Sequence, residues 1–589
     1  MSEVTDIGKT SEAEGNSNHP NKNIIICSDG TGNSGGIGPE TNVYRIYRAI
    51  DTHNAKRRQL KYYDDGIGTG GNKIWKLLGG AFGLGLDRNI IQAYTFLCRN
   101  YVEGDHIYLF GFSRGAYTVR ALASFISYCG VLKGIKKSNA TGDRVTAVDQ
   151  LDAERLAYEI DYLVELYMHR LQMEETFDLA TPNIAFVGVW DTVSAVGLPF
   201  ENKIKSLIAR SMFKFHFRDF DLSPKVDRAC HALAIDDQRK TFHPELWNKD
   251  QRIEQVWFSG MHSNVGGGYP KQGMAHVSLC WMISKVKSEN GEGSDGLLFF
   301  ESSVTGFEED ADPLGKMHDS RAGLAAYYRF EPRFFHQMES LDEINVDFSV
   351  IERIANQTGG YNPGNFALRL VGGEPQKLTV VNTPGDRGAK HLAAKVEGDI
   401  GTISSTLKTK YAETISFRQE ALHLAFLQFS LLLLIAFLSG YIALNTEGLS
   451  PPEITACIKK WAAGLSLVYV GTMAITFAYT QNWIKRALCV LTSLLPFGVI
   501  YLIPDEAAIL QGINGVLETV LGVMSWIVAV ILPDFLMEPV NYFITNSTAV
   551  ASIAVLIFGI LMFIRQKLSR EAKRVVFDSW KGVRQVVPD

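Results

Sequence analysis

Apolar and polar positions follow two regular patterns along the first 415 residues. Short apolar runs rich in β-branched residues predict strands, and stretches in which apolar residues recur every three or four positions predict amphipathic helices. The two kinds of segment alternate, which is typical of a mostly parallel sheet with helices on both faces. The predicted strands are 23–29, 60–66, 106–113, 184–191 and 254–260, and the predicted helices are 41–51, 86–101, 114–130 and 226–239.

Beyond residue 415 the pattern changes to long apolar runs. The run 424–444 contains 21 residues without a charge, which is enough for a helix to cross a hydrocarbon layer of roughly 30 Å. Such runs predict a C-terminal α-helical transmembrane bundle of four spans, with 504–546 as a re-entrant or interfacial segment. A count of five spans stays open. The four predicted spans are 424–444, 461–480, 487–503 and 548–564.

The charge distribution predicts the orientation of these spans. The first 22 residues are polar and lack an apolar stretch, so we expect a disordered leader and no signal peptide. The tail is rich in Lys and Arg, which favour the cytoplasmic side. Both ends are then cytoplasmic. The predicted domains are the leader (1–22), an α/β domain (23–290), an accessory, lid or connecting region (291–415), a transmembrane region (416–566) and a basic cytoplasmic tail (567–589).

Composition narrows the class of protein. The 589 residues carry a formal net charge of −5, whereas a nucleic-acid binder usually has a basic excess. Nucleic acid is therefore not an expected partner. The seven cysteines are scattered without a CxxC pair, and they predict buried free thiols in place of disulfides or a metal site.

The segment LFGFSRGAYT (109–118) places a serine where a predicted strand meets a predicted helix. The spacing G-x-S-x-G, with Gly111 and Gly115, is that of a nucleophile elbow, a strained turn that lifts the hydroxyl above the sheet edge. Ser113 is therefore the candidate nucleophile. The competing interpretation is a serine that caps a helix in a tight turn. The backbone N–H of Arg114, at the helix start, is a candidate oxyanion donor.

A reactive serine needs a base and an orienting acid, which follow it in the chain order Ser, Asp or Glu, then His. Asp191 ends the next predicted strand and His262 follows the last one, so we expect both at the sheet edge where Ser113 emerges. The sequence leaves alternatives at other aspartates and histidines. They are His231 and His243 for the base and Asp29, Asp236 and Asp237 for the acid.

The loop SDGTGNS after the first strand is expected to complete the site. Its backbone amides are candidates for the second oxyanion donor, and its first carboxylate is a candidate for ordering the loop. No cofactor is expected. Carboxylates at the same edge leave room for an accessory Ca²⁺ without further support from the sequence. The site-loop residues are Asp29, Gly30, Thr31 and Gly32, and the carboxylates are Asp29, Asp64 and Asp65.

Five blocks in register over residues 22–290 resemble a family of α/β-hydrolase domains that includes the catalytic domain of type VI secretion phospholipase effectors. The blocks are IIICSDGTGN, YYDDGIGTG, GFSRGAYTVR, GVWDTVSAVG and GMHSNVGGGYP. The resemblance implies an α/β-hydrolase-like fold and a serine lipolytic enzyme, with Ser113 as the serine, His262 as the histidine and Asp191 as the best match for the acid. Two features differ from the family. The apolar C-terminal block is not expected in a secreted effector. The candidate acid, Asp191, directly follows the next predicted strand after the one that precedes Ser113.

Together these features predict a membrane-anchored serine hydrolase that cleaves carboxylic esters, with a membrane lipid as the substrate. We expect an integral membrane protein, in contact with the bilayer of a bacterial inner membrane, with the catalytic domain and the tail in the cytoplasm. Two alternatives are a hydrolase-fold sensor or toxin that acts through its transmembrane block, and an anchored esterase for a soluble ester. The sequence leaves the oligomeric state open.

Overall fold

The computed structural model consists of two compact units, Met1–Ala412 with Val575–Asp589, and Glu413–Arg574. The described residues are 21–30, 38–66, 85–139, 142–173, 175–193, 221–288, 296–322, 325, 328–338, 342–368, 370–371, 374–385, 387–416, 418–420, 422–423, 426 and 548–581.

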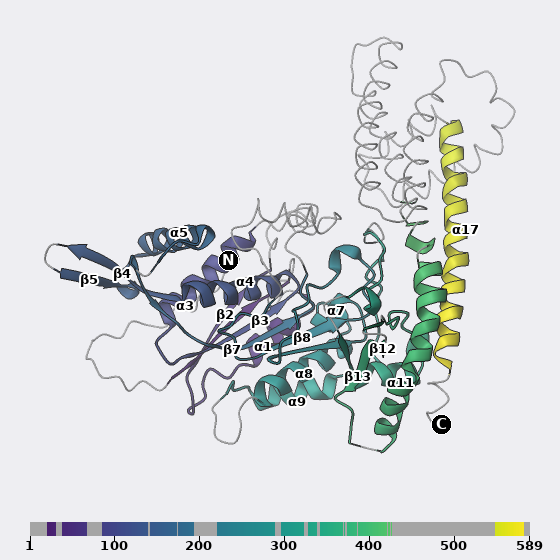
Figure 1. Ribbon diagram of the computed structural model, residues 1–589, viewed down its shortest axis with the longest axis horizontal. Helices are drawn as coiled ribbons and strands as arrows, with labels where there is room; N and C mark the ends of the chain where they lie inside the picture. Colours follow the sequence, from purple (N-terminus) through teal and green to yellow (C-terminus); the bar gives the residue numbers. More distant parts are fainter. Residues whose placement is uncertain are drawn as a thin grey trace, which may run out of the picture. The chain divides into compact units, whose positions relative to one another are not determined.

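An eight-stranded sheet, parallel at every pairing, runs through the first unit (Figure 1). The strand order is β13-β10-β9-β8-β7-β3-β1-β2, so the chain reverses its direction of advance between β1 and β3. Ligand sites in open parallel sheets lie at the carboxyl ends of strands near such a reversal. The strands are β1 (Asn23–Ser28), β2 (Gln59–Asp64), β3 (His106–Phe112), β7 (Ile184–Trp190), β8 (Ala229–Ala234), β9 (Ile253–Phe258), β10 (Glu343–Asp347) and β13 (Lys377–Val381).

Helices cover both faces of the sheet (Figure 1), which confirms the predicted α/β class. On one face the buried cluster includes α3 (Leu86–Asn100), α4 (Arg114–Cys129) and α5 (Ala153–His169). On the other it includes α1 (Asn42–Ala49), α8 (Gly273–Ser288) and α9 (Glu301–Asp310). The other α-helices within the described residues are α7 (His262–Gly266), α10 (Phe348–Ala355), α11 (Arg387–Thr406) and α17 (Thr548–Ser579).

Strand β1 shows why the sheet has two apolar faces. Its residues are all buried, and side chains alternate between the faces because a strand has a period of two. Ile24 and Ile26 belong to one hydrophobic cluster, whereas Ile25 and Cys27 belong to the other. A continuous apolar run is therefore what a strand covered on both faces requires.

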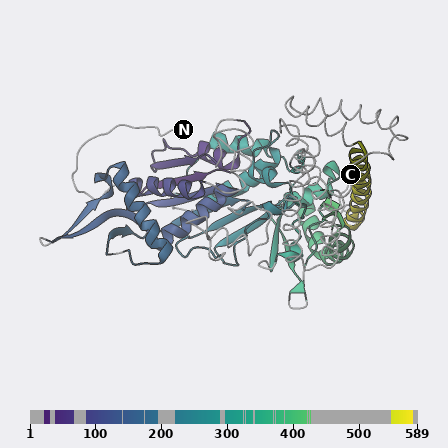
Figure 2. The same ribbon diagram turned by 90° about the horizontal axis from the view of Figure 1, so that it is seen from above.

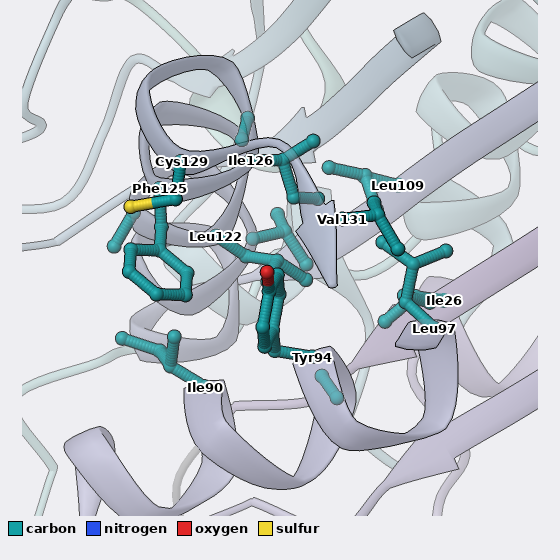
Figure 3. Close-up of a cluster of buried hydrophobic side chains, with 14 of the residues drawn as sticks. Ile26, Ile90, Tyr94, Leu97, Leu109, Leu122, Phe125, Ile126, Cys129 and Val131 are labelled. Atoms are coloured by element: carbon teal, nitrogen blue, oxygen red, sulfur yellow. The ribbon is translucent and has the colours of Figure 1, made fainter. Parts of the chain in front are cut away.

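The cluster on the α3 and α4 face is shown in Figure 3. Tyr94 of α3 is fully buried there, and its hydroxyl has two partners: it donates to the Gly130 carbonyl (2.9 Å) and accepts from the Leu132 N–H (3.2 Å). Cys98 and Cys129 line the same core as free thiols. These contacts hold α4, and with it the turn at its N-terminus, against the sheet.

One predicted helix is a strand. The segment 226–239 was expected to be amphipathic and helical, but ACHALA (229–234) forms β8, in register between β7 and β9. All six of its residues are buried. A short apolar run that is covered on both sides has no polar face, so its period does not distinguish a strand from a helix.

A second, three-stranded antiparallel sheet has the order β5-β4-β6, with β4 (Val131–Asn139), β5 (Gly142–Ala147) and β6 (Phe177–Ala180). The β4–β5 hairpin projects from the rest of the unit in both views (Figure 1, Figure 2). A short pair, β11 (Leu370–Val371) and β12 (Glu374–Pro375), precedes β13.

The eight-stranded sheet draws strands from both sides of residue 290, the predicted end of the α/β domain. Strands β10 and β13 extend it beyond β9, with β13 at the edge.

None of the helices within the described residues is both long and apolar enough to cross a bilayer. The predictions of a C-terminal transmembrane bundle and of an integral membrane location are therefore wrong on this finding. The predicted span 548–564 is the first part of α17. This helix continues through a basic segment to Ser579, and the hydropathy of the apolar run alone does not show that continuation. Apart from residue 426, the spans 424–444, 461–480 and 487–503 and the segment 504–546 lie outside the described residues.

The end of the chain contributes to the first unit through Trp580. Its side chain is fully buried, its indole N–H donates to the Pro363 carbonyl (2.8 Å), and its ring packs edge-to-face on Phe366 with centroids 5.0 Å apart. Part of the predicted basic tail thus completes a hydrophobic core.

Candidate active site

Ser113 lies directly after β3 and directly before α4. Its backbone has φ 59° and ψ −120°, a positive φ that non-glycine residues rarely adopt. The strain is held by neighbours: the Ser113 N–H donates to the Trp190 carbonyl (3.0 Å) and the Ser113 carbonyl accepts from Val193 N–H (3.4 Å). Strain of this kind gathers where a side chain must be presented for function.

The two glycines of the motif are required by space. A Cβ on Gly111 would lie 2.5 Å from the carbonyl oxygen of Gly115, and one on Gly115 would lie 2.5 Å from the carbonyl oxygen of Asp29. Both contacts are with backbone, which cannot turn aside as a side chain could. The elbow therefore brings α4 close to both β3 and the end of β1.

Asp191 follows β7, the neighbour of β3, and the register pairs Trp190 with Phe112. Asp191 also has a positive φ, 42°. Its carboxylate is fully buried and accepts four hydrogen bonds. At Oδ1 they come from Ala234 N–H (3.0 Å) and Arg333 Nη1 (2.7 Å), and at Oδ2 from His262 Nδ1 (2.5 Å) and Arg333 Nη2 (2.8 Å).

His262 begins α7, which follows β9. Its N–H donates to Asp237 Oδ2 (3.2 Å) while its Nδ1 faces Asp191, so the residue is held at both backbone and ring. The imidazole packs against the rings of Phe112 (4.6 Å) and Phe242 (5.0 Å). Because Nδ1 is used by the carboxylate, Nε2 is the ring nitrogen that remains for proton transfer.

The structure thus brings the three predicted residues to one edge of the sheet. Asp191 and His262 are in contact, Ser113 lies at the adjoining strand end, and the ring of Phe112, the residue before the serine, lies against the imidazole. A Cβ on Gly266 of α7 would overlap that same ring, which shows how closely α7 approaches β3. No hydrogen bond joins Ser113 Oγ to His262 among the described residues.

The alternative histidines have other partners. His231 lies in β8, where its Nε2 accepts from Thr192 N–H (3.1 Å), and burial lowers its pKa to about 3. His243 Nε2 contacts the Glu331 carbonyl (2.8 Å), and burial also lowers its pKa. Both side chains therefore serve packing and backbone hydrogen bonding.

The alternative aspartates hold the loop that carries His262. Asp236 accepts from Gly260 N–H (2.6 Å) and Tyr361 hydroxyl (2.9 Å). Asp237 pairs with Arg239, with Nη2 and Oδ2 2.7 Å apart, and also accepts the His262 N–H. They position the backbone of His262, whereas its ring faces Asp191.

Asp29 belongs to the same edge but to a different network. It accepts from its own neighbour Gly30 N–H (2.6 Å), from the Thr41 hydroxyl (2.5 Å) and from the Tyr63 hydroxyl (2.7 Å). Burial raises its pKa to about 6 despite these bonds. The Gly30 N–H is thereby used by Asp29. Thr31 and Gly32, the other candidates for the second oxyanion donor, lie outside the described residues.

The Asp64 carboxylate accepts from Ser28 Oγ (2.9 Å) and Asn89 Nδ2 (2.7 Å), and burial raises its pKa to about 7. Within the described residues, no group of three or more His, Cys, Asp or Glu side chains is arranged to hold a metal ion. Asp29, Asp64 and Asp65 as an accessory Ca²⁺ site stay a prediction.

Arg333 is the site residue that the sequence did not reveal. Its side chain is fully buried and donates two hydrogen bonds to Asp191, together with one each to the carbonyls of Ala234 and Phe242. The residue lies 142 positions from Asp191 in a segment without a catalytic motif. The available signal was its setting, FEPRFF, since an arginine among aromatic residues is buried only when it has an acidic partner.

The charges of this cluster fix its protonation. Burial alone would raise the pKa of Asp191, but the charge of Arg333 and the hydrogen bonds from His262 and Arg333 outweigh it and hold that pKa well below its usual range. For His262, burial lowers the pKa and outweighs the hydrogen bond and charge of Asp191, which raise it. A charged carboxylate therefore faces a neutral imidazole at neutral pH.

Fold and site together are those of an α/β protein with a serine elbow and an aspartate–histidine pair at the carboxyl edge of a parallel sheet. Residues 22–285 match the family model of the phospholipase effector Tle1-like catalytic domain of the type VI secretion system. The resemblance seen in the sequence blocks is confirmed for this segment.

The chain is also similar to an uncharacterized protein of Saccharomyces cerevisiae, with 30% identity over 236 residues. The alignment covers 38% of this chain and 32% of the yeast protein, so the chain spans about a third of the length of that relative.

Two solved structures are similar over parts of the chain. One is an uncharacterized protein from Pseudomonas aeruginosa (16% identity, TM-score 0.33, covering 68% of this chain and 61% of that one). The other is a Tle1 effector bound to the VgrG spike of the type VI secretion system (18% identity, TM-score 0.26, covering 46% of this chain and 55% of that one).

Proposed function

We propose that the protein is a serine hydrolase that cleaves the carboxylic ester bonds of phospholipids. The observation that carries the proposal is the 2.5 Å hydrogen bond between Asp191 and His262 beside a serine held in the strained elbow conformation. A serine that merely capped a helix would not need this pair, and Ser113 makes no side-chain capping hydrogen bond to α4.

In the proposed reaction, Ser113 Oγ attacks the ester carbonyl and its proton passes to Nε2 of His262. Asp191 orients the ring through Nδ1 and stabilises the imidazolium that forms. The alcohol then leaves with that proton, and a water molecule, deprotonated by the same imidazole, hydrolyses the acyl-serine and releases the fatty acid. Both half-reactions use one base.

The oxyanion that develops on the carbonyl needs N–H donors. As the first residue of α4, Arg114 has a backbone N–H without an acceptor inside the helix, and the helix dipole favours negative charge there. This N–H is the donor that we assign first. The second donor stays a prediction for the loop after β1, in which the Gly30 N–H is used by Asp29.

The phospholipid substrate rests on the match of residues 22–285 to the Tle1-like catalytic domain. A lipid ester and a small soluble ester share the same reacting group, so the elbow geometry does not separate them. A soluble ester therefore stays the alternative substrate class.

The first test uses a fluorophosphonate probe, which labels activated serines. We expect the wild-type protein and the control Ser124→Ala, a serine farther along α4, to be labelled, and Ser113→Ala to remain unlabelled. Labelling of Ser113→Ala, or of none of the three proteins, would refute a nucleophilic Ser113.

The second test offers the same preparations vesicles of phosphatidylethanolamine and phosphatidylglycerol, with p-nitrophenyl acetate in parallel. We expect release of fatty acid and lysophospholipid from the vesicles by the wild type and by Ser124→Ala, and none by Ser113→Ala. Turnover of the acetate alone would select the soluble-ester alternative.

A further inference from the structure

Arg333 forms a complete fork on the carboxylate of Asp191. Its two terminal nitrogens contact the two carboxylate oxygens at 2.7 and 2.8 Å, and neither side chain has exposed surface. Each oxygen accepts one further hydrogen bond, Oδ1 from Ala234 and Oδ2 from His262. With every lone pair engaged, the carboxylate has a single orientation, and that orientation determines where the imidazole lies.

The backbone around Arg333 is itself fixed to the segment that follows β8. Lys240 N–H donates to the Arg329 carbonyl and Glu331 N–H to the Gln238 carbonyl, both at 2.9 Å. From the other side, Asn365 Nδ2 donates to the Arg333 carbonyl (3.0 Å) and to the Ile235 carbonyl (2.9 Å). The segment that carries the Arg333 guanidinium to Asp191 is therefore held by hydrogen bonds to its backbone on both sides.

We propose that Arg333 is a positioning residue for the reaction, and that the segment 329–337, which lies outside the matched residues 22–285, is an integral part of the active site. This inference rests on the proposed function, because it assigns Arg333 a role in the same acid–base pair. The domain matched by the family would then lack one component of its own catalytic centre.

The second effect of Arg333 is electrostatic. The charges of Asp191 and Asp237 favour the imidazolium of His262, and the charge of Arg239 disfavours it. Arg333 and His262 contact the same oxygen of Asp191, so two positive charges would face each other across it once the ring is protonated. Arg333 therefore keeps the base neutral at lower pH than an aspartate–histidine pair alone would.

Two substitutions separate the fork from the charge. Arg333→Lys keeps the charge and loses the fork, whereas Arg333→Met loses both. For phospholipid hydrolysis we expect kcat to fall about 10-fold in the lysine variant and on the order of 100-fold in the methionine variant, with KM changed less than about twofold, because a misplaced base affects the chemical step. Arg252→Met, at a partly exposed Arg–Asp pair, is the matched control and should leave kcat unchanged.

The pH profile of kcat/KM distinguishes positioning from a purely structural role. We expect its acid limb to move to higher pH by about half a unit to one unit in Arg333→Met and to stay in place in Arg333→Lys. If both variants keep wild-type kcat, or lose activity only in proportion to unfolded protein with the acid limb unmoved, the inference is overturned.

Two further measurements keep the test decisive. If Arg333→Met does not fold, Asn365→Ala, which loosens the segment without touching Asp191, is expected to lower kcat with KM retained, and unchanged kcat would overturn the inference. If the wild type hydrolyses no ester, the proposed function fails. The His262 titration followed by NMR without substrate then tests Arg333 alone: a higher pKa in the methionine variant supports its electrostatic effect, and an unchanged pKa overturns it.

Discussion

Asp191→Asn should destabilise the protein strongly, because it leaves Arg333 buried without a counter-charge. The substitution preserves the shape of the side chain and removes one negative charge from a pair with no exposed surface. Removing one partner of a buried ion pair costs about 3–5 kcal/mol, since the remaining charge keeps its desolvation penalty. Against a typical total of about 5–15 kcal/mol, this is a large share of the free energy of unfolding.

The structure offers a control with the same chemistry at a partly exposed position. Asp250 and Arg252 also form a fork, with Nη2–Oδ2 and Nε–Oδ1 distances of 2.6 and 3.0 Å, but their side chains are 28% and 33% exposed. Exposed pairs contribute about 0–1 kcal/mol. Asp250→Asn should therefore change the free energy of unfolding by less than about 1 kcal/mol.

The assay is calorimetric or urea-induced unfolding of both variants at about pH 8 and pH 5. The pKa of Asp191 lies below its usual range in the folded protein, so the stability it contributes is present above the unfolded pKa and is lost as the pH falls through the folded pKa. The gap between wild type and Asp191→Asn should thus be the same at both pH values. A loss below about 1 kcal/mol, or equal losses in the two variants, would refute the reasoning from burial.

Asp191→Asn should also lower kcat by a factor on the order of 10⁴ in the vesicle assay, because an amide favours the wrong imidazole tautomer; wild-type turnover would exclude Asp191 as the orienting acid. Gly115→Ala should cost about 3 kcal/mol or more in urea unfolding, since its Cβ would meet backbone at 2.5 Å. The control Gly306→Ala, in α9 with open space around it, should be neutral or stabilising, and similar effects at both sites would contradict the steric argument. Burial raises the pKa of Asp64 to about 7, so the wild-type protein loses stability as the pH rises from about 4 through about 7. Asp64→Asn has no carboxyl to ionise there, and its free energy of unfolding should rise relative to wild type by up to roughly 4 kcal/mol over that window. A pH-independent difference in urea midpoints would contradict it.

The sequence determined the elements that carry local patterns. The alternation of strand-like and helix-like apolar patterns predicted the parallel α/β class, and the spacing of Gly111, Ser113 and Gly115 predicted the strained turn. Both patterns depend on residues within a few positions of one another. Asp191 and His262 could be proposed without contacts, since the carboxyl ends of parallel strands share one edge of the sheet. Their contact could not be read from the chain, because it depends on the loops that follow β7 and β9.

Tertiary structure decided what depends on surroundings. The run 229–234 was misread as helical because a strand covered on both faces has no polar period, and only the pairing of β8 with β7 and β9 resolves it. The apolar C-terminal runs predicted membrane spans from composition, and no helix among the described residues bears this out. Arg333 reaches Asp191 across 142 positions. An ion pair of that kind is set by how two distant segments pack, and no local pattern records it.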